Sequence, residues 1–137
     1  MDSASSKQAV ITAWKAFATR DPAQISAVLT PDVRWNAPPG NATAKALNAG
    51  HELNHDDMVR FMSVEMDKLF VKDVKVTFNG LFADGPTVIL EQRFQATLAN
   101  GRPYDNDYCF VIEVKDGRIH RMREYMDTQR GFGAIFG

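Results

Sequence analysis

The sequence predicts an α+β fold, on two main observations. Apolar residues in the first half of the chain recur at helical spacing, as Val10, Trp14 and Phe17 do. The second half alternates apolar and polar residues in long runs, with the hairpin signals Asn100-Gly101 and Asp116-Gly117 between them. Helices followed by a meander of strands are typical of α+β folds. We expect a curved, cone-shaped sheet with helices on its concave side, large enough to enclose one small molecule.

Three helices are expected in the first half. The first spans about Ser6–Thr19. The second begins at Pro22, a residue suited to the first helical position, and is stopped by Pro31. The third spans about His55–Leu69, with Asn54 as its N-cap.

The strands expected in the second half are long. They span Val74–Phe82, Thr87–Leu98, Tyr104–Lys115 and Arg118–Met126. A shorter strand around Val33 and Trp35 comes earlier, followed by a loop over residues 37–50. That loop is either the lid or rim of a pocket or a solvated connector. The tail over residues 128–137 has no predicted structure.

Length and composition limit the possible functions. The 137 residues form one expected domain, 1–137, with 45% hydrophobic and 24% charged residues. A net charge of −1 argues against general nucleic-acid binding. The single cysteine, Cys109, excludes an internal disulfide. A polar N-terminus and the lack of a membrane-length apolar run predict a cytoplasmic protein without a membrane partner.

The order of elements and four local strings resemble the NTF2-like superfamily, specifically its SnoaL-like and ketosteroid-isomerase-like branch. The strings are Ala27–Trp35, Asn106–Val111, Asp116–Ile119 and Arg123–Asp127. The resemblance implies a cone-shaped, cystatin-like α+β barrel, with three N-terminal helices packed on a curved, mainly antiparallel sheet. It also implies a mostly apolar pocket and a homodimer. Members include steroid isomerases, polyketide cyclases, epoxide hydrolases and dehydratases, and others only bind ligands or partners.

The residues that carry steroid isomerisation in this family do not match. The tyrosine of the first helix falls on Ala13, and the general base before a proline falls on Ala37. The second oxyanion donor falls on Cys109-Phe110. The epoxide hydrolases have an Arg-x-Asp pair and an acid on the last strand, and here these positions hold Arg93, Gln95 and Glu124. This sequence therefore has the arginine and one of the two carboxylates of the epoxide hydrolases, namely Arg93 and Glu124.

Strand alternation gives an independent argument for Glu124. It lies between Met122 and Met126 on one face of its strand, as a cavity-facing acid would. The alternative is an exposed glutamate paired with a surface arginine. If Arg93 lies beside Glu124, the carboxyl stays ionised and acts as a general base. If Arg93 points elsewhere, the carboxyl is protonated near neutral pH and acts as a general acid.

Further residues are candidates to contact a ligand. Tyr104, Asn106 and Tyr108 share one strand face and could donate hydrogen bonds to a carbonyl or enolate oxygen, although tyrosines on such a face are as often core residues. The complete set of expected binding residues is Trp35, Tyr104, Asn106, Tyr108, Gln95, Phe17, Met58, Met62, Phe110, Met122 and His55.

The segment His51-Glu52-Leu53-Asn54-His55 matches the zinc-protease motif H-E-x-x-H. That motif needs both histidines on one helical face. Because Gly50 precedes His51 and the apolar helical pattern begins only at Met58, His51 is expected in a loop. We therefore expect no metal, and either solvated or pocket-rim histidines.

The sequence leaves three functions to weigh, and one of them is a metallohydrolase built on the His51–His55 segment. Of the other two, the first is a cofactor-free acid/base enzyme that acts on a small, mostly apolar carbonyl or epoxide compound, with Glu124 as the acid or base and Arg93 as its orienting partner. The second is a non-catalytic dimer that binds a small molecule or another protein. Neither requires a nucleic acid or a membrane.

Overall fold

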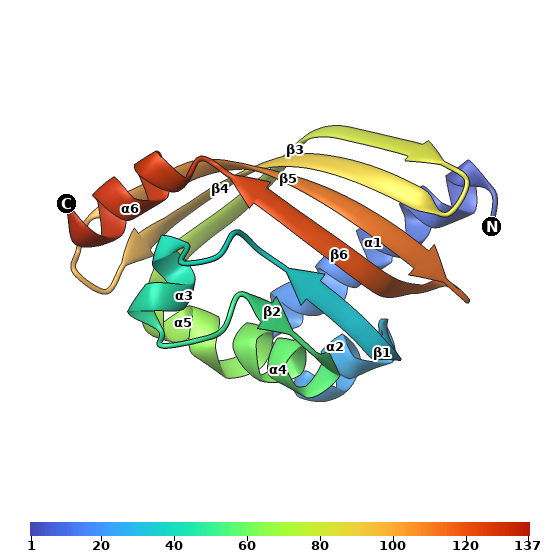
Figure 1. Ribbon diagram of the computed structural model, residues 1–137, viewed down its shortest axis with the longest axis horizontal. Coiled ribbons are helices and arrows are strands. Elements are labelled where there is room, and N and C mark those ends of the chain that lie inside the picture. Colours follow the sequence, from blue (N-terminus) through green and yellow to red (C-terminus); the bar gives the residue numbers. More distant parts are fainter.

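One curved, unclosed sheet organises the chain, and the computed structural model describes residues 1–137 (Figure 1). Its six strands have the order β2-β1-β6-β5-β4-β3. The strands are β1 (Leu29–Asn36), β2 (Glu52–Leu53), β3 (Phe70–Asp84), β4 (Thr87–Leu98), β5 (Pro103–Lys115) and β6 (Arg118–Met126). The helices are α1 (Ser3–Thr19), α2 (Pro22–Ala27), α3 (Ala42–Ala46), α4 (His55–Arg60), α5 (Met66–Leu69) and α6 (Thr128–Phe136).

The pairing of the strands confirms the predicted α+β fold with a mainly antiparallel sheet. β3, β4, β5 and β6 form an antiparallel meander, and β1 joins β6 in parallel. α1 packs across β3, β4, β5 and β6, on the concave face of the sheet. The main core forms between them, with Val10, Phe17, Leu90, Phe110 and Met122 among its buried residues.

The second helix ends earlier than predicted. α2 stops at Ala27, and Pro31 lies inside β1 instead of ending the helix. Proline lacks the N–H that a sheet needs, so it is tolerated where strand pairing is interrupted. The register between β1 and β6 is irregular between Leu29 and Arg34, which includes Pro31.

The third predicted helix is continuous but changes character along its length. Asn54 caps α4, as expected, because its side chain accepts from the Asp57 N–H, and the Asp57 side chain accepts from the Asn54 N–H to complete a capping box. A π-helical segment, Phe61–Glu65, then separates α4 from α5. π-Helical turns inside α-helices are rare and frequent at functional sites. No helix in the structure is both long and apolar enough to cross a membrane.

Three elements have no counterpart in the sequence prediction, and one of them is the short strand β2. α3 lies within the expected loop of residues 37–50, and α6 occupies the unassigned tail. Asp127 caps α6, since its side chain accepts from the Arg130 N–H. α6 packs on α3 and β5, so the tail covers one end of the sheet (Figure 1).

Candidate functional site

An apolar cavity of about 360 Å³ lies between α1, the π-helical segment and the concave face of the sheet. Seventeen of its 25 lining residues are hydrophobic. Its size and apolar lining are typical of a site for a small organic molecule. The loop of residues 37–50 contributes Ala37, Asn41 and Thr43, so this segment is a rim of the cavity.

Glu124 is the one carboxylate with a strongly buried position in this lining. β6 places it on the concave face, where its residue is 8% exposed, and no salt bridge or hydrogen bond reaches its carboxyl group. Burial raises the pKa of Glu124 from 4.5 to about 8. The buried indole N–H of Trp35 opposes this rise in pKa, although its geometry falls short of a hydrogen bond and it has no other partner.

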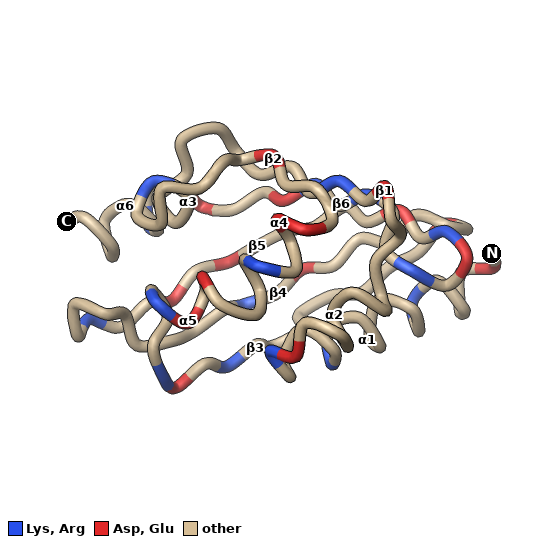
Figure 2. The backbone as a smooth tube through the Cα atoms, turned by 90° about the horizontal axis from the view of Figure 1, so that it is seen from below, with Lys and Arg blue, Asp and Glu red and all other residues tan.

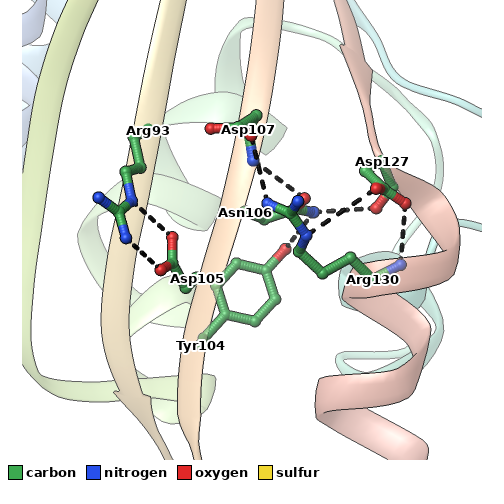
Figure 3. Close-up of polar contacts among 7 residues, drawn as sticks. All are labelled: Arg93, Tyr104, Asp105, Asn106, Asp107, Asp127 and Arg130. Carbon is green, nitrogen blue, oxygen red and sulfur yellow. Dashed lines mark hydrogen bonds and ion pairs between the residues drawn. The ribbon is translucent and has the colours of Figure 1, made fainter.

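Arg93 lies on the opposite face of the sheet, so the prediction that it orients Glu124 is wrong. Its guanidinium group holds Asp105 with two hydrogen bonds, from Nε to Oδ1 at 2.8 Å and from the terminal nitrogen to Oδ2 at 2.5 Å (Figure 3). That ion pair raises the pKa of Arg93 and lowers the pKa of Asp105. Gln95 faces outward with Arg93, because alternate residues of a strand point to opposite faces.

The inward-facing polar residue of β4 is Gln92, which the sequence prediction missed. It lines the cavity and accepts a hydrogen bond from the Trp14 Nε1–H at 2.8 Å. This bond occupies the amide oxygen and leaves the amide N–H groups as donors. The signal was available in the sequence: Gln92 is the one polar residue on the apolar face that contains Leu90 and Phe94.

The predicted tyrosine group forms a hydrogen-bonded chain that ends at the cavity. Asn106 Nδ2 donates to the Tyr104 hydroxyl at 3.2 Å and to the Asp127 carbonyl at 3.0 Å, and the Tyr104 and Tyr108 hydroxyls lie 2.5 Å apart. Figure 3 shows Tyr104, Asn106 and Asp127 of this chain. Only Tyr108 lines the cavity. Burial raises its pKa well above 10, so the phenol keeps its proton.

The structure brings about half of the predicted residues to the cavity. Besides Glu124 and Tyr108, the lining includes Phe17, Trp35, Met62, Phe110 and Met122. Tyr104 and Asn106 lie behind Tyr108 without lining the cavity. Met58 is buried in the core instead, and His55 lines a separate polar hollow with Ser26 and Asp56 as its hydrogen-bond partners.

The H-E-x-x-H segment does not have the geometry of a zinc protease. His51 lies in a bend, Glu52 and Leu53 form β2, and His55 begins α4, so the two histidines share no helical face. No group of three or more side chains of the metal-binding types lies close enough to hold a metal ion. His51 is among the residues that line the apolar cavity.

The family model for the SnoaL-like domain matches residues 10–122. The chain belongs to this family. It resembles solved structures over nearly its whole length. An NTF2-like protein of unknown function from Burkholderia pseudomallei K96243 has a TM-score of 0.80 and 22% identity, with 100% of both chains covered.

Two other solved structures that the chain resembles have informative names. TerC, co-crystallised with polyporic acid, has a TM-score of 0.80 and 21% identity and covers 97% of this chain and 99% of its own. An LEH-like epoxide hydrolase from M. tuberculosis has a TM-score of 0.75 and 19% identity, with 98% and 92% covered. At these identities the likeness shows the shared fold alone. No curated protein is similar enough to count as a match.

Proposed function

We propose that this SnoaL-like protein is a cofactor-free acid/base enzyme in which protonated Glu124 donates its proton to a carbonyl or epoxide oxygen. Its substrate would be a small, mostly apolar compound. The observation that supports this most is the one buried carboxyl group of an apolar cavity, with its pKa raised to about 8. A group with that pKa is protonated about ten to one at pH 7 and lies close to the ideal for proton transfer.

The absence of a cation beside Glu124 favours the acid over the base. Arg93 is on the other face, and the arginine that lines the cavity, Arg20, is paired with Asp67 at 3.1 Å. Without a positive partner, only the Trp35 N–H favours the carboxylate form, and burial outweighs it, so the resting enzyme holds the proton. A substrate oxygen that gains negative charge would receive that proton.

The remaining polar groups of the cavity support a substrate with hydrogen-bond acceptors. The Trp35 N–H is buried without a partner, Gln92 has free amide N–H groups, and Tyr108 stays protonated. Preorganised donors stabilise negative charge that develops on an oxygen. The apolar lining disfavours charged substrates.

The alternative is a binding protein that uses the same cavity without chemistry. The replacement of family isomerase residues by Ala13 and Ala37 favours it, since Ala13 is buried core and Ala37 lines the cavity without any titratable group. Both functions require the cavity to bind an apolar ligand, and only the enzyme requires Glu124 to exchange a proton.

The test begins with a thermal-shift screen of apolar ketones, epoxides and aromatic polyketides. A ligand at 100 times its dissociation constant stabilises the protein by about 2.7 kcal/mol. For each hit, product formation is then compared between the wild type, Glu124→Gln and Glu91→Gln, an exposed glutamate of β4. We expect Glu124→Gln to lower turnover by about 10²–10⁴-fold and Glu91→Gln to leave it unchanged. Equal turnover in the wild type and Glu124→Gln would contradict the acid role, and binding without turnover would favour the alternative.

A further inference from the structure

A second, polar hollow lies beside β1, separate from the apolar cavity. It is bounded by the end of α2, the start of β1, the start of α4 and the start of β6. One of its eight lining residues is hydrophobic, and none of them lines the apolar cavity. Arg34 and Arg118 contribute to this lining from two different strands. The proposed acid/base chemistry uses nothing in this hollow.

The two arginines of the hollow have no acidic partner. Five of the nine arginines form ion pairs with carboxylates, and Arg102 binds the backbone oxygen of Gly137. The remaining three have neither an ion pair nor a contact with Gly137, and they are Arg34, Arg118 and Arg121. All three lie on β1 and β6, which are neighbouring strands with basic residues visible along them in Figure 2.

The placement of two unpaired arginines opposite each other is unfavourable for the pairing of β1 and β6. Arg34 and Arg121 are register partners on adjacent strands, and both are exposed on the same side of the sheet. Like charges directly opposite each other destabilise a sheet. The register is irregular next to this pair. Between the paired positions, β1 advances by five residues, from Leu29 to Arg34, while β6 advances by two, from Ile119 to Arg121. The extra β1 residues form one wall of the hollow through Pro31.

The other polar groups of the hollow leave donors free. Arg34 gives one guanidinium N–H to the Val33 carbonyl at 3.1 Å and keeps the others. The Asn54 side-chain oxygen accepts from the Asp57 N–H at 3.0 Å, which leaves its amide N–H groups.

The one acid of the hollow, Asp56, is already engaged. Its carboxylate lies 3.0 Å from His55 Nδ1, and its side chain is 98% exposed to solvent. His55 Nε2 lies 3.0 Å from the Ser26 hydroxyl, so both ring nitrogens have partners. Because the Asp56 carboxylate is exposed to water, it repels an anion in the hollow only weakly. The two unpaired guanidinium groups attract the same anion more strongly.

We propose that this hollow binds a phosphate group, carried by a phosphate monoester or present as the free ion. Two guanidinium groups match the charge of a dianion, and each can place two N–H donors on phosphate oxygens. Arg34 and Arg118 bind the phosphate, and Asn54 contributes a neutral donor.

Calorimetric titration of the full chain with phenyl phosphate, inorganic phosphate and succinate tests this site. The variants are Arg34→Gln and Arg118→Gln, with Arg93→Gln as a control that removes the same charge from an exposed, ion-paired position. We expect phosphate binding that weakens at least tenfold in the first two variants and is unchanged in Arg93→Gln. Binding of both phosphates assigns the site to the phosphate group alone, and binding of phenyl phosphate only assigns it to an ester.

A second readout keeps the test independent of how the variants fold. In the wild-type protein, phosphate should move the ¹⁵N–¹H signals of the Arg34 and Arg118 Nε–H groups and leave that of Arg93 in place. Three results would overturn the proposal: no binding of either phosphate, equal binding by all three variants, or succinate binding as tight as phosphate.

Discussion

Glu124 keeps a carboxyl group where its charged form has no positive partner, and this makes the stability of the protein depend on pH. The folded protein holds the proton up to about pH 8, whereas the unfolded chain releases it near pH 4.5. Between these values the folded state binds more protons than the unfolded state, so stability falls as the pH rises. At about 1.4 kcal/mol per pH unit, the loss is at most about 5 kcal/mol.

Glu124→Gln should remove this dependence. We expect the free energy of unfolding of the variant, relative to the wild type, to rise between pH 4.5 and pH 8 and to stay constant above that range. Urea unfolding of both proteins across pH 4–9 measures the difference. A difference that does not change with pH would show that Glu124 is not a buried neutral acid.

Alternation of side chains along a strand correctly predicted which strand residues of the site face inward. The prediction for Arg93 was wrong because it did not follow this alternation. Alternation placed Glu124 with Met122 and Tyr108 with Phe110 on inward faces, as the structure does. Arg93 was chosen because of the family resemblance, although it shares a face with Glu91, away from the apolar face of β4. Gln92 was available by the argument that selected Glu124.

At the scale of elements, strong local signals set the boundaries that the sequence predicted well. β4 ends and β6 begins where predicted, because Asn100-Gly101 and Asp116-Gly117 adopt positive φ at Gly101 and Gly117 and form the hairpin turns. Asn54 likewise begins α4 through its capping box. These features depend on residues close together in the sequence.

The elements that the sequence did not predict depend on contacts between distant segments. α6 contains Gly131 and Gly133, which weaken helical propensity, but its position is fixed by α3 and β5. A Cβ at Gly131 would lie 3.3 Å from Asn106 Nδ2 and from the Tyr104 hydroxyl, so this glycine permits the helix to approach the tyrosine chain. The π-helical segment likewise carries Phe61, which packs edge-on against Trp35 with ring centroids 5.2 Å apart.

At the scale of the whole molecule, the convex face of the sheet carries exposed apolar residues that a partner could cover. Phe82, Ile89 and Tyr125 come from β3, β4 and β6 and are 58%, 40% and 54% exposed. Phe82 and Ile89 are register partners, and Ile89 is in turn paired with Val111. Exposed apolar patches of this kind mark interaction surfaces, and we propose that a second copy of the chain binds here.

The dimer is tested by light scattering during gel filtration. We expect about twice the mass of the 15.3-kDa chain for the wild type and for Val64→Glu, which adds a charge at an exposed apolar residue of the π-helical segment. Ile89→Glu should give the monomer, because it places a charge inside the proposed interface. A monomeric wild type, or an Ile89→Glu variant that stays dimeric, would exclude this surface.

The proposed chemistry of the cavity and the pH dependence of stability both rest on the protonation state of Glu124. Titration of the Glu124 carboxyl group is therefore the most direct test. Glutamate labelled with ¹³C at Cδ gives a carboxyl signal for each residue, and Glu124→Gln assigns that of Glu124. We predict a titration midpoint near pH 8. A midpoint near 4.5, the ordinary value for glutamate, would mean that the carboxyl group is solvated or paired, and the role of Glu124 as a proton donor would fall.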